Sequence, residues 1–304
     1  MDVRTTLQRA TAELQTAGVS SHGLAAELLL QHALGRDRAW IYGHPEAEME
    51  PEAAEHFRKL VARRAAGTPT QYLTGKQEFW GIEFHVGPGV LIPRPETEHV
   101  VEVALERLKP RRAPVKSDLT LRRERVGRSL RIVDVGTGSG CLAVALAREV
   151  PQARVWATEI SRAALAIAWR NVVRYDLEAR IEFMEGSLLT PFLLGGPGEN
   201  AVPFDLVVSN PPYVPRSELG ALPREIREHE PEEALVPGET GLEVFRPLIR
   251  QAEKVLAPGG ALVLEVGAGQ AGEVRPLFGE AWTQISVAED LAGIPRVVSA
   301  ERKP

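Results

Sequence analysis

The chain of 304 residues has room for about two folded domains, and its 44% hydrophobic and 25% charged residues exclude an intrinsically disordered protein. A formal net charge of −5 argues against a protein that coats nucleic acid over a broad basic surface. The one cysteine, Cys141, excludes an intrachain disulfide and a zinc site built on several thiolates. No apolar run approaches the ~20 residues that span a bilayer, and the first residues lack the apolar core of a signal peptide. The expected location is therefore the cytoplasm, without a membrane partner.

The first 73 residues are predicted to form a small bundle of helices. Apolar residues recur there at helical spacing in three groups: Leu7, Ala10, Leu14 and Ala17; Ala25, Leu28, Leu29 and Ala33; and Ala53, Phe57, Leu60 and Val61. Gly35 stands where the second helix is expected to end, and Pro51 stands in the first turn of the third. The four histidines of this region have no metal-ligand spacing, so no metal site is predicted.

Residues 74–100 change character and are interpreted as a β-hairpin connector. Gly81 can turn the hairpin, since it is surrounded by strand-forming residues: Phe79, Trp80, Ile82, Phe84 and Val86. Two prolines in the run LIPRPETE, residues 91–98, then stiffen the backbone. Thr97 is expected to cap a helix that starts near Glu98.

From residue 101 onward, strand patterns alternate with helix patterns. Strands are expected at residues 131–135, 154–157, 204–208, 261–266, 284–287 and 296–300. Helices are expected at residues 141–150, 163–175 and 242–256, the last stopped by Pro258-Gly259-Gly260. This alternation predicts an α/β fold, doubly wound, with a mostly parallel sheet covered by helices on both faces. Ligands of such sheets bind beyond the carboxyl ends of the strands.

Residues 109–131 interrupt the alternation with a basic stretch. They hold nine lysine or arginine residues against Asp118 and Glu124. We interpret the stretch as a solvated loop. The alternative is an electrostatic contact for RNA.

The first strand leads into a glycine-rich loop, DVGTGSG at residues 134–140. Glycines permit a sharp strand-to-helix turn and let a ligand approach the backbone closely. A dinucleotide-binding fingerprint needs glycine or alanine where Cys141 stands, so a cofactor without phosphates is favoured. Glu159, at the end of the second strand, can accept hydrogen bonds from the hydroxyls of a ribose, and Asp134 can act through the loop backbone. These features resemble the S-adenosylmethionine-dependent methyltransferases of the doubly wound class. The alternative is a glycine turn that only closes a βα unit.

The motif Asn210-Pro211-Pro212-Tyr213 follows the apolar strand at residues 204–208. A planar amide or aryl amine is a poor nucleophile because its lone pair is delocalised, so an enzyme that methylates one must position it. The Asn210 side-chain oxygen can accept one N–H of such an acceptor, and the Pro211 carbonyl can accept the other. Pro211 and Pro212 fix the backbone, and the Tyr213 ring can lie against the flat face of the amide. The motif therefore predicts a glutamine side chain or an exocyclic base amine as acceptor. The alternative is a rigid proline turn without chemistry.

Further stretches help to separate these acceptor classes. Together with the two motifs, they are YLTG (72–75), VLIPRPETE (90–98), DVGTGSG (134–140), NPPY (210–213), EPEEAL (230–235), GETGL (238–242) and DLAG (290–293). With these stretches the chain resembles the HemK-type (PrmC) peptide chain release factor glutamine methyltransferases over nearly its whole length. The resemblance implies a seven-stranded sheet, S-adenosylmethionine as cofactor and S-adenosylhomocysteine as product. It implies methylation of the side-chain amide nitrogen of the glutamine in the Gly-Gly-Gln tripeptide of class I peptide chain release factors.

The resemblance also implies a division of the chain and a set of site residues. Residues 1–73 would be a helical domain that helps hold the release factor, residues 74–100 a hairpin linker, and residues 101–304 the methyltransferase domain. The cofactor would contact Gly136, Thr137, Gly138, Ser139, Gly140, Glu159, Leu188 and Asn210. The catalytic and substrate-binding residues would be Asn210, Pro211, Pro212 and Tyr213. No metal is implied.

Three features depart from the family pattern. Glu159 stands where the family usually has aspartate, and Leu188 stands in a stretch where an aromatic residue often lies beside the adenine. The basic stretch, residues 109–131, is also longer than the family usually has.

Two other enzymes and a binding module remain as alternatives. One enzyme is a glutamine methyltransferase of a ribosomal protein. The other methylates the exocyclic amine of adenine or cytosine in nucleic acid, which calls for a broad basic surface and a separate base-recognition domain. A module without catalysis is disfavoured because both motifs are intact. No stable nucleic-acid complex is expected, although residues 109–131 leave contact with RNA open.

Overall fold

The computed structural model describes residues 1–112, 129–193 and 203–304, and these form two compact units. A helical unit comprises Met1–Gln77, Val86–Pro88 and Ala221–Glu230. A sheet unit comprises the described residues of Glu78–His85, Gly89–Gly220 and Pro231–Pro304. The chain therefore passes between the two units more than once.

The helical unit is built on three helices that pack on one another, α1, α2 and α4. Its helices are α1 (Val3–Thr16), α2 (His22–Leu34), α3 (Arg38–Gly43), α4 (Pro51–Ala65), α5 (Thr70–Thr74) and α11 (Arg224–His229). The Asp2 side chain caps α1 by accepting from the Thr5 backbone N–H, at 2.7 Å. Gly35 ends α2 in the left-handed region at φ 61°, and Pro51 opens α4, so both predictions from the sequence are confirmed. Apolar side chains of the three helices fill the core, among them Leu14, Leu29, Leu30 and Phe57.

The helical unit includes Ala221–Glu230, which lies more than a hundred residues further along the chain. Within this unit, Arg64 forms an ion pair with Glu225, and only 5% of Arg64 is exposed. Gly67 also comes close to Arg224, since a Cβ at Gly67 would lie 3.3 Å from the Arg224 Nε. The helical spacing of the first 73 residues did not indicate this addition.

The predicted hairpin around Gly81 is present. It consists of β1 (Lys76–Phe79) and β2 (Ile82–His85), which form a two-stranded sheet. Trp80 and Gly81 join the strands, both with positive φ, at 54° and 67°. A two-residue turn of this kind matches the twist of the strands that it connects.

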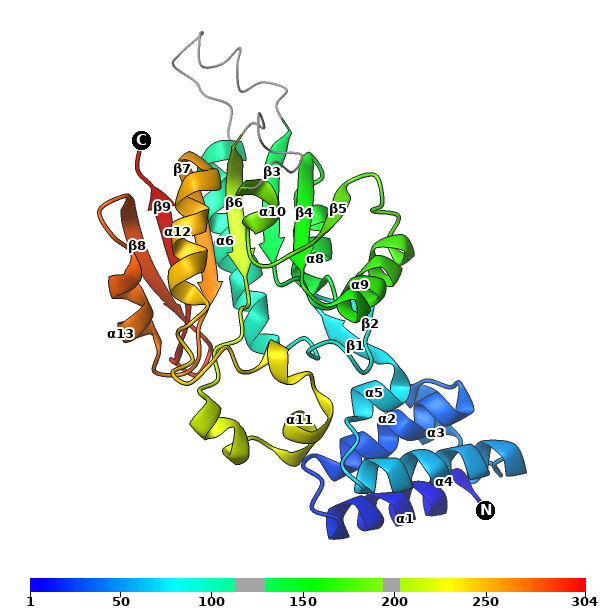
Figure 1. Cartoon of the computed structure of the whole chain (residues 1–304). Coiled ribbons are helices and arrows are strands. Elements are labelled where there is room, and N and C mark those ends of the chain that lie inside the picture. The colour runs from blue at the N-terminus through cyan, green and yellow to red at the C-terminus, as the bar shows by residue number, and fades with distance from the viewer. Residues whose placement is uncertain (113–128, 194–202) are drawn as a thin grey trace. The chain divides into compact units, whose positions relative to one another are not determined.

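The sheet unit contains the predicted α/β fold, a seven-stranded and mostly parallel sheet among the described residues (Figure 1). Its strands are β3 (Leu130–Val135), β4 (Ala153–Glu159), β5 (Ile181–Glu185), β6 (Phe204–Ser209), β7 (Leu256–Glu265), β8 (Trp282–Glu289) and β9 (Pro295–Arg302). Their order is β5-β4-β3-β6-β7-β9-β8, and β9 alone of these strands runs antiparallel to its two neighbours. The central strands β3 and β6 are buried almost throughout, which explains their continuous apolar sequence.

Helices cover both faces of this sheet (Figure 1). One face carries α6 (Glu98–Arg112), α8 (Cys141–Glu149) and α9 (Arg162–Arg174). The other carries α10 (Thr190–Leu193), α12 (Phe245–Val255) and α13 (Ala271–Val274). Short 3-10 helices occur as η1 (Pro95–Thr97), η2 (Arg216–Ala221), η3 (Glu232–Ala234) and η4 (Arg275–Leu277). The arrangement confirms a doubly wound sheet.

The structure corrects the sequence prediction in two places. Strand β5 was not predicted, because it is a short edge strand whose glutamates, such as Glu182, interrupt its apolar residues. The helix predicted at residues 242–256 starts later and ends at Val255, and Pro258-Gly259-Gly260 lies within β7. The register of β7 against β6 shifts at this point, so the proline and the two glycines form an irregularity in a strand.

The basic stretch at residues 109–131 lies mostly outside the described residues. Its first residues continue α6 as far as Arg112, and its last residues begin β3. Within the parts of the chain that the structure describes, no helix has the length and apolar character to cross a bilayer. The same parts hold no cluster of three histidine, cysteine or carboxylate side chains suited to a metal ion.

Candidate active site

A cavity of about 310 Å³ lies where β3, β4 and β6 end at their carboxyl ends. Six stretches of the sheet unit line it, three completely (residues 89–91, 186–188 and 209–212) and three in part (residues 135–138, 159–164 and 231–244). The volume is within the usual range of small-molecule sites, about 300–1,000 Å³. The position follows the rule for open α/β sheets, whose ligands bind beyond the carboxyl ends of the strands.

The glycine loop presents backbone to this cavity. Gly136 and Gly138 line it with φ values of 70° and 55°, and a Cβ at either position would meet no atom within 4 Å. Thr137 and Ser139 are buried and are not among the lining residues. Gly140 also lies behind the cavity, where its Cα faces α9 so closely that a Cβ would lie 3.3 Å from the Ala168 Cβ. The loop therefore offers the cavity open space at two glycines and is packed tightly at the third.

Asp134 holds the loop from beneath. Its Oδ2 accepts from the Thr137 hydroxyl at 2.6 Å and from the Ala143 N–H at 3.2 Å. Complete burial raises the pKa of Asp134 to about 7, against the two hydrogen bonds, which lower it. Burial also raises the pKa of the Cys141 thiol to about 12, so this cysteine is not a nucleophile at neutral pH.

Glu159 lies at the end of β4, with one side toward the loop and another toward the cavity. Its Oε2 accepts from the Gly138 N–H at 3.0 Å. Its Oε1 accepts from the N–H groups of Ile160 and Ser161, at 2.8 and 3.0 Å. A carboxylate has about four acceptor positions, so three backbone bonds leave room for a ligand hydroxyl. The residue therefore both braces the loop and presents an acceptor to the cavity.

The proline turn after β6 forms another part of the lining. Asn210, Pro211 and Pro212 all line the cavity. The Ser209 hydroxyl donates to the Val135 carbonyl at 2.7 Å, and so ties the end of β6 to the end of β3. This bond places the proline turn beside the glycine loop.

The side chains that line the cavity fit a nucleoside that has no phosphate and carries a cationic group. Glu159 and Glu233 are the charged side chains among the described lining residues, and none of those residues is lysine or arginine. Leu188, with a positive φ of 52°, and Ile160 add apolar surface. A phosphate-bearing cofactor would meet no positive side chain there, whereas S-adenosylmethionine has a ribose for Glu159 and a positive charge that two carboxylates favour.

The chain matches known proteins over its whole length. Residues 5–75 match the family model described as PrmC N-terminal domain, and residues 117–226 match the model described as Methyltransferase small domain. The chain is 41% identical over 304 residues to a Release factor glutamine methyltransferase of Koribacter versatilis, covering 100% of this chain and 99% of the relative. It is 42% identical over 297 residues to a Release factor glutamine methyltransferase of Geobacter sulfurreducens, covering 97% and 95%.

This chain belongs to the family of release factor glutamine methyltransferases. It is a methyltransferase that uses S-adenosylmethionine. Among solved structures, it resembles the 16S rRNA N2 G1207 methyltransferase of T. thermophilus in complex with AdoMet and guanosine, with a TM-score of 0.51 and 22% identity. That match covers 75% of this chain and 50% of the other, and it shows the shared methyltransferase fold.

Some residues that line the cavity were not among the site residues predicted from the family motifs. Val90 and Leu91 come from the stretch before Pro93, and Pro231, Val236 and Pro237 come from the stretch that follows α11. Val90, Leu91 and Pro231 lie in stretches that matched the family in sequence, residues 90–98 and 230–235, and that match was the one signal for their place in the site. Val236 and Pro237 follow the second of these stretches and had no signal in the sequence.

Tyr213 lies behind the proline turn and is not among the residues that line the cavity. Its hydroxyl donates to the Glu265 Oε1 at 3.1 Å, and its carbonyl oxygen accepts from the Gln270 Nε2 at 2.8 Å. Gly241 approaches the same carbonyl so closely that a Cβ would lie 2.4 Å from it. Residues after β7 and before α12 thus hold the end of the motif in place.

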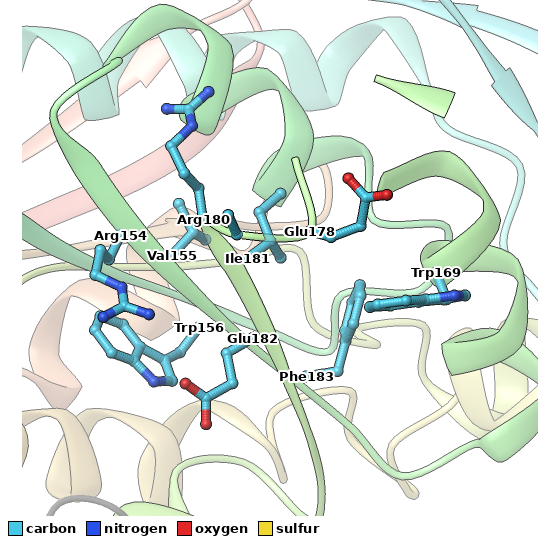
Figure 2. A pocket seen from close by; sticks show the side chains of 10 residues that line it. Arg154, Val155, Trp156, Trp169, Glu178, Arg180, Ile181, Glu182 and Phe183 are labelled. Carbon is cyan, nitrogen blue, oxygen red and sulfur yellow. The ribbon is translucent and has the colours of Figure 1, made fainter. Parts of the chain in front are cut away.

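A second hollow, of about 340 Å³, lies at the opposite ends of β4 and β5 (Figure 2). Figure 2 shows the Arg154 guanidinium beside the Trp156 ring and the Trp169 ring against Phe183. The hollow borders the open edge of the sheet at β5 and contains none of the residues predicted for the site. It lies at the amino ends of these parallel strands, so it is not part of the candidate active site.

Proposed function

We propose that this methyltransferase acts on the side-chain amide nitrogen of the glutamine in the Gly-Gly-Gln tripeptide of class I peptide chain release factors. Full-length similarity to relatives with this substrate in their name supports the proposal. The observation that carries it is that Asn210 and Pro211 line the same cavity as Gly136, Gly138 and Glu159. An acceptor amide bound at the proline turn would therefore share one cavity with a cofactor bound at the glycine loop and Glu159.

The residues proposed to hold the cofactor are Gly136, Thr137, Gly138, Ser139, Gly140, Glu159, Leu188 and Asn210. Gly136 and Gly138 leave space for it, Glu159 accepts from its ribose, and Leu188 contacts its base. Thr137, Ser139 and Gly140 act by shaping the loop, since none of the three lines the cavity. S-adenosylmethionine, when bound, supplies a methyl group activated by a sulfonium and is converted to S-adenosylhomocysteine.

Asn210, Pro211, Pro212 and Tyr213 are proposed to present the acceptor. The Asn210 Oδ1 accepts one hydrogen of the glutamine amide and the Pro211 carbonyl accepts the other, which turns the nitrogen lone pair toward the methyl group. Orientation of this kind can contribute up to ~7–11 kcal/mol to lowering the barrier. The methyl carbon would form a bond to the amide nitrogen as its bond to the sulfonium sulfur breaks, and one amide proton would leave to water, so no residue of the turn needs to become charged.

The helical unit is proposed to help hold the release factor. Residues 1–73 would supply most of this surface, residues 74–100 would act as the hairpin linker, and residues 101–304 would carry out the transfer. Similarity to the PrmC N-terminal domain over residues 5–75 supports a role shared with relatives. Membership of Ala221–Glu230 in the helical unit adds a segment that follows the proline turn in the chain.

Single-turnover methylation tests the function through Asn210→Ala. The rate is expected to fall ~10²–10³-fold, because the amide loses an acceptor aimed at the reacting group. Asn210→Asp keeps an oxygen but adds a negative charge that favours the ground-state cation, so it should also be slow.

The substrates for this test are a purified release factor, its Gly-Gly-Gln variant with alanine for glutamine, a ribosomal protein and nucleic acid. We expect the enzyme to methylate only the release factor that retains its glutamine. Near wild-type transfer by Asn210→Ala would contradict the role of Asn210, and methylation of the glutamine-free release factor at an unchanged rate would contradict the target.

A further inference from the structure

The Asn210 side chain has a partner that determines which of its two polar atoms can face the cavity. Its Nδ2 donates to the Thr97 Oγ1 at 3.0 Å. The amide oxygen and nitrogen diverge from one carbon, so a nitrogen bound to Thr97 leaves the Oδ1 oxygen on the other side. Thr97 is 2% exposed, which keeps water from replacing it as the partner. The residue pattern around Thr97 predicts a connector and a helix cap, and the family resemblance includes Thr97 in a matching stretch without giving it a role in the site.

The Thr97 hydroxyl in turn lies near a buried carboxylate. A hydroxyl that accepts from an amide still has one hydrogen to donate. Oε2 of Glu265 is buried without a partner that meets hydrogen-bond geometry among the described residues. The strand register places Asn210, which binds Thr97, beside Glu265, because Ser209 pairs with Leu264. A hydrogen bond from the Thr97 side chain also lowers the pKa of Glu265, so the Thr97 hydroxyl is a donor within reach of this carboxylate.

The same carboxylate holds the other end of the proline turn. Oε1 of Glu265 accepts from the Tyr213 hydroxyl at 3.1 Å. Glu265 is the last residue of β7 and is 1% exposed, so it is a rigid and dry anchor. One buried carboxylate therefore binds Tyr213 directly and lies near Thr97, the partner of Asn210. Asn210 and Tyr213 flank the two prolines.

We propose that Glu265 and Thr97 are positioning residues for methyl transfer: Glu265 orients the Thr97 hydroxyl as an acceptor for the Asn210 Nδ2 and thereby keeps the Asn210 Oδ1 on the acceptor side of the cavity. The inference rests on the proposed function, because it assumes that Asn210 Oδ1 binds the substrate amide. A hydroxyl oriented the other way would donate to Asn210, whose amide would then turn its nitrogen toward the cavity. Two N–H donors would face each other, and the acceptor would not be held.

A matched pair of variants at Thr97 tests the direction of this hydrogen-bond chain. Thr97→Val has nearly the same shape but no hydroxyl, and Thr97→Ser retains it. Thr97→Val should lower the single-turnover rate at least about tenfold, but by less than the ~10²–10³-fold expected for losing a group aimed at the reacting atoms. Thr97→Ser should restore most of that rate. The Kd for S-adenosylmethionine and the Tm should change little in either, which separates positioning from loss of fold.

Glu265→Gln provides a second variant with a different chemical effect. A glutamine side chain has one oxygen for Tyr213 but presents an N–H donor where Thr97 needs an acceptor. Its rate loss should overlap with that of Thr97→Val, so that the double variant is no slower than the slower single variant. Additive losses would mean that the two residues act separately, and the proposal would be wrong.

The orientation of Asn210 can also be observed without measuring activity. The chain has three asparagines, Asn171, Asn200 and Asn210, so a sample with ¹⁵N-labelled asparagine gives three pairs of side-chain amide signals, one ¹⁵N shift for each residue. The Asn210 signal is identified by its absence from Asn210→Ala. It should shift in Thr97→Val and in Glu265→Gln and stay near its wild-type position in Thr97→Ser.

The two readouts distinguish the two proposals. A wild-type enzyme that methylates the release factor glutamine while Thr97→Val keeps both its rate and its Asn210 signal overturns the positioning role alone. A wild-type enzyme that fails to methylate that glutamine overturns the proposed function. In that case, an unmoved Asn210 signal in Thr97→Val would overturn the positioning role as well, and a moved one would support it.

Discussion

Glu159 binds three backbone N–H groups and also faces the cavity, so its removal should affect the cofactor more than a surface acceptor would. Glu159→Ala should weaken S-adenosylmethionine binding, since a hydrogen bond to a charged group contributes about 1.5–3 kcal/mol. This range corresponds to a Kd roughly 10–150-fold higher, measured by calorimetric titration. Glu159→Asp keeps the charge and serves as the control, with a smaller loss. An unchanged Kd for Glu159→Ala would show that another residue holds the ribose.

Asp134 and Glu265 are two buried carboxyl groups that make stability depend on pH. Burial raises the pKa of Asp134 from 3.8 to about 7. Burial, together with the nearby Glu96, raises the pKa of Glu265 from 4.5 to about 7, while Thr97, Tyr213 and Arg296 oppose the rise. Between about pH 4 and pH 7 the folded protein therefore holds more protons on these groups than the unfolded chain does. Their contribution to the free energy of unfolding is present below this window and is lost as the pH rises through it.

The expected result is a Tm that falls in the wild type between about pH 4.5 and pH 7, by more than it falls in Asp134→Asn or Glu265→Gln. Each group contributes a slope of at most about 1.4 kcal/mol per pH unit. Comparison with the variants removes the effect of the other titrating groups. Equal slopes for the wild type and both variants would mean that neither carboxyl group titrates with a raised pKa.

At the scale of elements, the loop that contains Gly241 determines where the acceptor turn lies. Gly241 has φ 80° and approaches the Tyr213 carbonyl oxygen, which also accepts from Gln270. The same loop is closed by Glu243, whose Oε1 accepts from the Thr240 N–H at 2.7 Å. The bond belongs to a turn that includes residues for which the apolar pattern predicts a helix. Helix α12 therefore begins at Phe245 and not at residue 242. The stretch GETGL thus supports the site through its backbone.

Gly241→Ala should displace Tyr213, because the new Cβ would lie 2.4 Å from a backbone oxygen. We expect a lower methylation rate and a loss of stability greater than the ~1–2 kcal/mol that a left-handed conformation costs an alanine. Gly18→Ala is the matched control, since Gly18 has φ 74° and its Cβ would meet no atom within 4 Å. Similar Tm losses in both variants, with full activity in Gly241→Ala, would show that the close approach is not required.

The distribution of charge belongs to the scale of the whole molecule. The net charge of −5 includes the strongly basic residues 109–131, most of which lie outside the described structure. We interpret that stretch from its sequence as a solvated loop, so it should contribute little to methylation of an isolated release factor.

Replacing residues 113–128 by a glycine-serine linker of equal length should leave the Tm and the methylation rate within about twofold of the wild type, because the change lies between α6 and β3 and spares both. A scrambled segment with the same charges is the control. A large loss with the linker, but not with the scrambled segment, would make the stretch an electrostatic binding element.

The alternation of apolar strands and helices determined the α/β class, because both faces of a covered parallel sheet must be apolar wherever the sequence places a strand. The family was determined by contiguous motifs such as residues 134–140 and 210–213, which are legible without a structure. The sequence did not predict edge strand β5 or the irregular start of β7, because half-exposed strands and bulges have weak apolar patterns.

Only the tertiary structure brought Thr97 to Asn210, 113 residues away in the chain, and Glu265 to Tyr213. Neither Thr97 nor Glu265 has a local pattern that indicates a site. Glu265 lies beside Asn210 because the parallel strands β6 and β7 end at one edge of the sheet. Thr97 reaches Asn210 from η1, the short helix before α6. The same holds for Ala221–Glu230, which belongs to the helical unit and contains Glu225, the ion-pair partner of Arg64. Spacing along a chain predicts elements and contiguous motifs, whereas contacts between distant side chains depend on how those elements pack.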